Sequence, residues 1–236
     1  MSSKLELPFP LRPYQEEGFN FLLSKQRALL GDDMGLGKTV QSIVSLKKLY
    51  NENGFFRALI VVPNPLITNW SEEFNLWFKD SSLQILKGDL FDRTAQLKRS
   101  KGFVLCSYEQ MRASFTRNHQ IPKYEIVILD EAQRIKNNSS ATYLAARRIS
   151  KNKMWMLSGT PLENRIEDIV SIFSVLKWNT IQAGYSRPEI TNKIAPYFLR
   201  RLKTDVLEEL PELIEENVYV NMTAKQKIRY ENTYNQ

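Results

Sequence analysis

The sequence predicts an α/β fold, a three-layer sandwich with a mostly parallel central sheet and helices on both faces. Short apolar runs alternate with stretches of helical spacing between residues 27 and 177, which is typical of parallel sheets covered by helices. The first apolar run, Arg27–Leu30, leads through a glycine-rich turn into a helical stretch. A later, fully apolar run, Ile126–Leu129, fits a strand buried on both faces.

Each expected element follows from its periodicity and from the residues that begin or end it. Leu11–Leu23 is predicted to be a helix, and Pro13 suits its first turn because a missing N–H costs nothing there. Further helices are expected at Thr39–Tyr50, Asn69–Phe78, Arg93–Arg99, Ala141–Ile149 and Arg165–Lys177. Strands are expected at Ala58–Val62, Leu83–Leu86, Phe103–Ser107, Ile126–Leu129 and Met154–Leu157.

The regular alternation stops after Lys177. We expect residues 1–178 to form the core, residues 179–196 a short polar excursion, and residues 197–222 a return to the core with a last strand at Val218–Val220. Residues 223–236 begin a polar helix that ends without a cap. The sequence is therefore expected to be a piece of a larger protein.

The glycine-rich turn Gly31–Thr39 is a candidate phosphate-binding loop. A strand that turns through glycines into a helix N-terminus directs free N–H groups and the helix dipole at an anion. Lys38 is expected to reach the β- and γ-phosphates, and the Thr39 hydroxyl to hold Mg²⁺. The strict motif has glycine where this chain has Asp32, so we interpret the turn as a variant loop, with an ordinary glycine turn as the alternative. The expected nucleotide contacts are Asp33, Met34, Gly35, Leu36, Gly37, Lys38 and Thr39.

Two adjacent carboxylates, Asp130 and Glu131, follow the buried run Ile126–Leu129. Open α/β sheets bind ligands at the carboxyl ends of their strands. Asp130 is expected to hold Mg²⁺ through its water shell, and Glu131 to orient and polarise the attacking water. The alternative is a strand that ends in two solvated acids, which the phosphate loop in the same chain makes less attractive. The predicted catalytic residues are Lys38, Asp130 and Glu131, acting on ATP with Mg²⁺.

Composition narrows the class of protein and its partners. The 236 residues are 42% hydrophobic and 25% charged, with no long apolar run or signal-type segment, so we expect an intracellular protein without a membrane partner. It would be cytoplasmic or nucleoid-associated in a prokaryote and nuclear in a eukaryote. One cysteine, Cys106, and one histidine, His119, argue against disulfides and structural zinc. The net charge of +7 favours a polyanionic partner, although each basic cluster could simply be a solvated face.

Seven blocks of residues occur along nearly the whole chain in one order. They are Leu11–Gln15, Gly31–Thr39, Leu59–Pro63 with Asn69–Trp70 and Glu73–Phe74, Ser107–Glu109, Asp130–Gln133 with Ile135–Asn137, Leu157–Asn164, and Phe198–Val206 with Glu209–Pro211. In this order they resemble the Q motif, motifs I, Ia, Ib, II and III, and the end of the first lobe of the Swi/Snf family of DNA-dependent ATPases, in helicase superfamily two. The resemblance implies the RecA-like sandwich of P-loop NTPases.

The resemblance also implies roles for individual residues. Gln15 would read the adenine edge, because an amide offers a donor and an acceptor in one plane. The γ-phosphate state would be coupled to lobe movement by Gln133, Ser158, Gly159 and Thr160. The phosphates of DNA would be contacted by Pro63, Asn64, Ser107, Tyr108 and Lys136. The alternatives are an exposed helical glutamine, a plain turn and loop residues without a ligand, whereas Trp70 and Trp77 fit the core better than a base-stacking role.

The family resemblance implies the ATP-binding lobe of a motor that translocates along double-stranded DNA. The family's longer helical protrusion is replaced here by Trp178–Ala195, and residues 223–236 would begin the linker to a second RecA-like lobe of the same polypeptide. That lobe supplies arginine fingers, which contribute roughly 10³–10⁵ in rate in related chemistry. The isolated chain is therefore expected to be a nearly inactive ATPase.

Two other functions remain open at this point. A strand-separating RNA or DNA helicase would share the nucleotide site, although Gln133 and the Ile135–Asn137 tail differ from the Asp-Glu-Ala-Asp RNA type. A non-catalytic scaffold gated by a nucleotide is the second, and the intact Lys38, Asp130 and Glu131 count against it.

Overall fold

The computed structural model describes residues 5–54, 56–117, 121–135, 139–159, 166–182, 184–206 and 222–234. The chain divides into two units, Met1–Val206 and Leu207–Gln236. In the second unit, the described residues include one helix, α10 (Ala224–Tyr234). None of the helices in these described ranges is long and apolar enough to cross a lipid bilayer.

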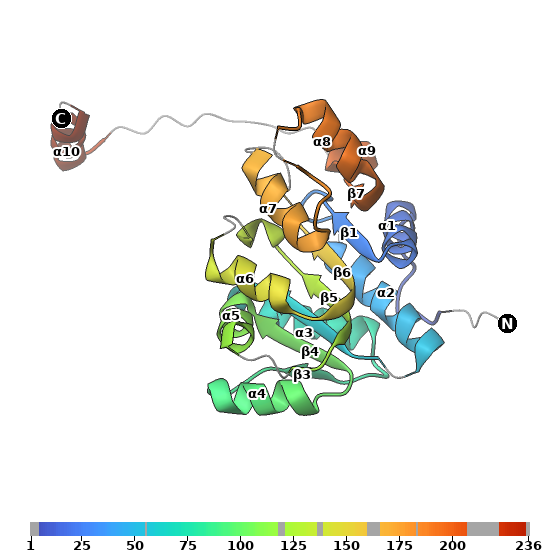
Figure 1. Cartoon of the computed structure of the whole chain (residues 1–236). Coiled ribbons are helices and arrows are strands. Elements are labelled where there is room, and N and C mark those ends of the chain that lie inside the picture. The colour runs from blue at the N-terminus through green and yellow to red at the C-terminus, as the bar shows by residue number, and fades with distance from the viewer. Residues whose placement is uncertain are drawn as a thin grey trace. The chain divides into compact units, whose positions relative to one another are not determined.

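The first unit is built on a seven-stranded sheet with the order β3-β4-β2-β5-β6-β1-β7 (Figure 1). All strand pairs in the described part are parallel. The strands are β1 (Arg27–Leu30), β2 (Ala58–Val62), β3 (Leu83–Ile85), β4 (Phe103–Ser107), β5 (Tyr124–Leu129), β6 (Lys151–Leu157) and β7 (Phe198–Leu199). The predicted α/β fold with a parallel sheet is confirmed.

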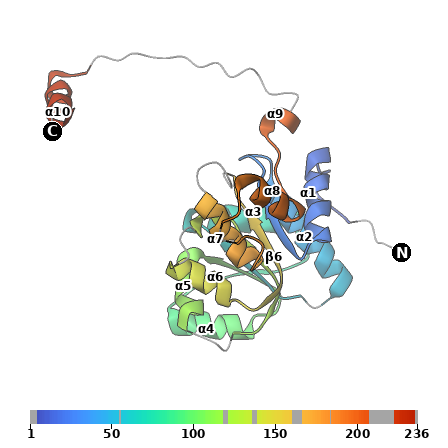
Figure 2. The same cartoon turned by 45° about the horizontal axis from the view of Figure 1, so that its top comes forward.

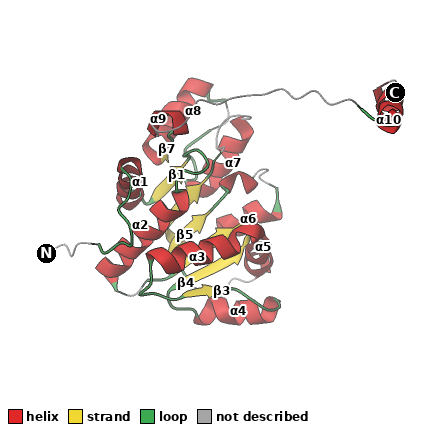
Figure 3. Ribbon diagram, turned by 180° about the vertical axis from the view of Figure 1, so that it is seen from behind, coloured by secondary structure: helices red, strands yellow, loops and turns green. Residues whose placement is uncertain are grey.

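Helices cover both faces of the sheet because alternate strand residues point to opposite sides (Figures 2 and 3). One apolar core packs against α1 (Pro13–Ser24), α2 (Lys38–Asn53) and α3 (Ile67–Trp77). The opposite core packs against α4 (Leu90–Arg99), α5 (Tyr108–Arg117), α6 (Ala141–Arg148), α7 (Ile166–Leu176) and α8 (Arg187–Ile194). In β5, for example, Ile128 belongs to the first core and Val127 to the second.

The structure differs from the expected elements in several places, among them strand β7 and helix α9 (Lys203–Val206), which lie where only a last strand at Val218–Val220 was expected. Helix α5 was not predicted, although Ser107 accepts a hydrogen bond from the Gln110 N–H and acts as its cap. Helix α8 lies inside the stretch expected to be a polar excursion. Short 3-10 turns at Asn64–Leu66, Ala132–Arg134 and Ala195–Tyr197 were also not predicted. The expected strand Val218–Val220 lies outside the described residues.

Candidate nucleotide site

The candidate phosphate loop leaves the carboxyl end of β1, which lies between β6 and β7 in the sheet. Gly35 and Gly37 adopt φ values of 88° and 72°, a left-handed region that glycine enters without steric cost. Gly37 is also the N-cap of α2, so Lys38 and Thr39 occupy the first turn of that helix. The sequence therefore folds into the strand, turn and helix N-terminus that anion binding requires.

Lys38 lies over the loop that precedes it. Its ammonium donates hydrogen bonds to the carbonyl oxygens of Asp32 and Asp33, at 2.7 and 3.1 Å. Burial lowers the pKa of Lys38, and the nearby carboxylates of Asp32, Asp130 and Glu131 act in the opposite direction. The predicted phosphate-binding cation and the two predicted catalytic acids therefore share one electrostatic environment.

Asp32, which departs from the strict loop motif, is fully buried and bound by Arg201. Arg201 Nε donates to Asp32 Oδ1 at 3.0 Å, and Nη2 donates to Asp32 Oδ2. The same guanidinium donates to Gln41 Oε1 at 3.0 Å and to Glu17 Oε2 at 3.1 Å, and also to the Tyr14 carbonyl. We call the buried group Asp32, Gln41 and Arg201 the arginine anchor. A glycine at position 32 could not form it.

Helix α1 packs closely against the loop and the arginine anchor. A Cβ on Gly18 would lie 1.7 Å from Gln41 Oε1, so glycine is required at this approach. Gln15, the predicted reader of adenine, accepts a hydrogen bond from the Arg12 N–H at 3.0 Å. Its Nε2 lies 2.5 Å from the place where a Cβ on Gly37 would be. The structure thus places Gln15 beside the phosphate loop, and its contact with adenine stays a prediction.

Both carboxylate oxygens of Asp130 are held by protein donors. Trp70 Nε1 donates to Oδ2 at 2.7 Å, and the Glu131 N–H donates to Oδ1 at 2.8 Å. The hydroxyl of Tyr108 donates to the Asp130 carbonyl at 2.6 Å. Burial raises the pKa of Asp130, and the hydrogen bond from Trp70 lowers it. Trp70 lies in the core as the sequence suggested, but it also orients the predicted metal ligand.

Glu131 has a left-handed backbone, with φ 51° and ψ 52°, which is rare for a residue with a side chain. Its carboxylate accepts a hydrogen bond from Gln133 Nε2, and Gln133 Oε1 in turn accepts one from Ser158 Oγ at 2.7 Å. A Cβ on Gly159 would lie 3.7 Å from Lys38 Nζ. The ends of β5 and β6 are therefore connected beside the phosphate loop. Thr160, also predicted to act here, lies outside the described residues.

The residues predicted to contact DNA differ in their exposure to solvent. Asn64 is exposed after β2, and Pro63 beside it is buried. Ser107 and Tyr108 are both buried, and their hydroxyls are bonded inside the protein to Gln110 and Asp130. Both hydroxyls therefore already have partners inside the protein, and the expected DNA contact at Ser107 and Tyr108 stays a prediction. Lys136 lies outside the described residues.

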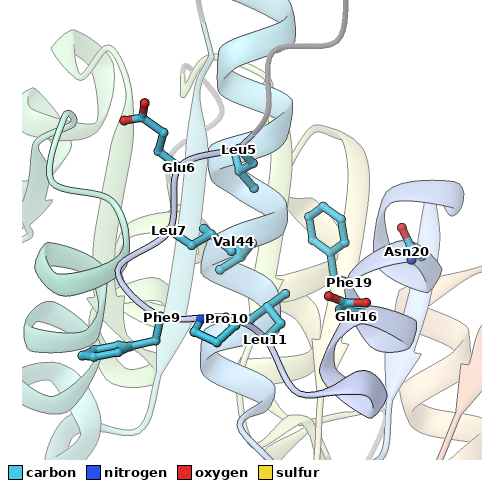
Figure 4. Close-up of a pocket in the computed structure, with 10 residues that line it drawn as sticks. All are labelled: Leu5, Glu6, Leu7, Phe9, Pro10, Leu11, Glu16, Phe19, Asn20 and Val44. Atoms are coloured by element: carbon cyan, nitrogen blue, oxygen red, sulfur yellow. The ribbon is translucent and has the colours of Figure 1, made fainter.

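A groove of about 830 Å³ lies between the N-terminal segment, α1 and α2 (Figure 4). Figure 4 shows Leu7 and Leu11 of the segment beside Val44 of α2, with Glu16 and Phe19 coming from α1. None of the predicted site residues within the described ranges lines this groove. The candidate site is therefore defined by the strand ends and not by this cavity.

The family model described as SNF2-related domain matches residues 14–236. An ATP-dependent helicase of Mycoplasma genitalium is 31% identical over 94% of this chain and 23% of its own length. The ISWI chromatin-remodeling complex ATPase ISW1 of Saccharomyces cerevisiae is 32% identical over 93% of this chain and 22% of its own length. The chain thus spans about a quarter of the length of these curated relatives.

The chain is also similar to a solved structure, the SWI2/SNF2 ATPase core of Sulfolobus solfataricus in complex with double-stranded DNA. It superposes on this chain with a TM-score of 0.78 and 27% sequence identity. The match covers 100% of this chain and 55% of that one.

Proposed function

The chain belongs to the SNF2-related domain family, and on that premise we propose that it is the ATP-binding lobe of a double-stranded-DNA translocase. Joined to a second RecA-like lobe, it would hydrolyse ATP with Mg²⁺. One observation carries the proposal: Lys38, Asp130 and Glu131 lie together at the carboxyl edge of one parallel sheet. They are close enough that the two carboxylates act on the pKa of Lys38. That edge is where open α/β sheets bind ligands.

The residues at this edge divide the chemistry among them. Lys38 and the N–H groups of the loop bind phosphate oxygens. Thr39 and Asp130 offer the hard oxygen ligands that suit Mg²⁺, whose charge would offset that of the phosphates. Glu131 accepts the proton of the attacking water, and its direction is set by its left-handed backbone and by Gln133.

The Gln133–Ser158 hydrogen bond supports a coupling role for the ends of β5 and β6. A change at the γ-phosphate that moves Glu131 would be passed through Gln133 to the segment after β6. Closure and reopening of two lobes around ATP would then alternate the grip on DNA. Strand separation is not required for this movement.

The test of nucleotide binding is Lys38→Ala in this chain, with Lys193→Ala as the matched control on the exposed face of α8. We expect titration calorimetry to show no measurable Mg-ATP binding for Lys38→Ala and unchanged binding for the control. The apo melting temperature should be nearly the same for both. Binding by Lys38→Ala at the parent affinity would refute the assignment.

Hydrolysis is tested in the longer protein that carries the second lobe. Glu131→Gln keeps the shape and hydrogen-bonding capacity of the side chain but removes the base. We expect it to bind ATP and to lose on the order of 10²–10⁴ in stimulated turnover. Full turnover would remove Glu131 from the mechanism.

The DNA partner is supported by the net charge of +7, by the exposed Asn64 after β2 and by the DNA complex of the similar Sulfolobus core. Phosphate contacts should give a log affinity that falls with log salt by roughly 0.9 per contact, with little dependence on sequence. Fluorescence anisotropy with duplex DNA, single strands and RNA separates a translocase from a strand-separating helicase. A clear preference for RNA would contradict the proposal.

A further inference from the structure

The segment 198–206 runs beside the phosphate loop for several residues. Strand β7 pairs with β1, and the Gly31 N–H then donates to the Leu199 carbonyl at 2.7 Å. The Asp33 N–H donates to the Arg201 carbonyl at 3.0 Å. The Lys203 N–H donates to Asp33 Oδ2 at 3.1 Å. These hydrogen bonds therefore fix the position of the Lys203 backbone relative to the loop.

The arginine anchor also connects segment 198–206 to the phosphate loop, because Arg201 belongs to the segment and Asp32 to the loop. Arg201 is buried and binds Asp32 through two nitrogens, two residues before Lys203. A bidentate guanidinium–carboxylate pair restricts orientation as well as distance. The base of the Lys203 side chain is thus part of a rigid support of the phosphate loop.

The ammonium of Lys203 lies against the loop itself. A Cβ on Gly35 would be 3.4 Å from Lys203 Cε and 3.5 Å from Nζ. Lys203 is exposed, and within the described ranges it forms no ion pair with an acidic side chain. An exposed cation beside a loop whose N–H groups bind anions is well placed for a second contact to the same anion.

We propose that Lys203 is a second cationic ligand of the nucleotide's phosphate chain, opposite to Lys38. The inference deepens the proposed function and rests on its nucleotide site at Gly35–Thr39. Lys38 would bind from inside the loop, and Lys203 from the flank formed by segment 198–206. Because Lys203 needs only its charge and reach, arginine should replace it better than glutamine.

The experiment compares Lys203→Gln, Lys203→Arg and the control Lys193→Gln, with Mg-ATP and Mg-ADP as ligands in calorimetry. We expect Lys203→Gln to weaken both nucleotides by about 10–150-fold, the effect of one charge-assisted hydrogen bond. Lys203→Arg should recover most of that loss, and Lys193→Gln should bind like the parent. Removing one phosphate-binding charge should also make log Kd less sensitive to salt.

Two results would overturn this proposal. One is binding by Lys203→Gln within twofold of the parent while Lys38→Ala abolishes binding. The other is a lowered apo melting temperature in Lys203→Gln together with weak binding that arginine does not rescue, which would make Lys203 a structural residue. If Lys38→Ala itself binds normally, the nucleotide site fails first, so the two failures are distinguishable.

Discussion

Replacing Arg201 by methionine tests the arginine anchor directly. The change removes the guanidinium but leaves the Asp32 carboxylate fully buried, with only the Gln41 amide as a side-chain partner. Breaking a buried ion pair by removing one member costs roughly 3–5 kcal/mol. For a unit of this size, 1 kcal/mol shifts Tm by roughly 2–4 °C, so we expect Tm to fall by roughly 6–20 °C.

Two further variants make this prediction specific. The double variant Arg201→Met with Asp32→Asn removes both charges, so it should recover much of the loss. As a control, Glu52→Gln removes the exposed carboxylate from its i,i+4 pair with Lys48 and should change the free energy of unfolding by roughly 0–1 kcal/mol.

Thermal and urea denaturation of the apo protein measure all three variants. The reasoning is refuted if Arg201→Met melts within about 2 °C of the parent. It is also refuted if the double variant is no more stable than Arg201→Met. Either result would mean that the Asp32 carboxylate does not depend on the guanidinium.

Three more predictions follow from the same geometry. Gly18→Ala places a methyl group 1.7 Å from Gln41 Oε1, and we expect a loss of about 1–3 kcal/mol in urea denaturation; unchanged stability would contradict it. The Trp70 hydrogen bond lowers the pKa of Asp130, so in Trp70→Phe this carboxylate should become protonated at a higher pH than in the parent. In calorimetry from about pH 8 down to 5, Mg²⁺-dependent ATP affinity should therefore be lost at a higher pH in the variant, and identical profiles would count against it. Burial lowers the pKa of Lys151 to about 8 from an ordinary 10.5, so between these pH values the native state binds fewer protons than the unfolded state. The free energy of unfolding should therefore rise with pH in this range, and Lys151→Met should remove that rise.

The fold was predictable because its signals are local. The apolar run Ala58–Val62 coincides with β2, and the turn after Leu30 enters a helix as expected. Helix α5 is not evident from the motifs, because Ser107–Glu109 resembles a DNA-contacting block, although Tyr108, Met111 and Phe115 all face one core. One short motif can therefore hide the periodicity around it.

The candidate site was only partly predictable. The loop and the two carboxylates are adjacent in sequence to the strands that place them, so local patterns predicted them. The partners of these residues come from elsewhere: Arg201 is 169 positions from Asp32, and Trp70 is 60 from Asp130. The signal for the first was the missing glycine at position 32. The indole N–H that reaches Asp130 leaves no such signal, because Trp70 also satisfies a core position.

The separation of Asp32 and Arg201 in sequence also sets the interval between their synthesis on the ribosome. The loop leaves the ribosome early, but its buried carboxylate gains its cation only after another 169 residues have been added. At about 5–20 residues per second, that interval is roughly 8–34 s. A nascent chain that stops before Arg201 would carry the complete Gly31–Thr39 loop with an unpaired acid at its base. We expect such a chain to be unable to retain ATP, so nucleotide capture would mark a lobe whose synthesis is essentially finished.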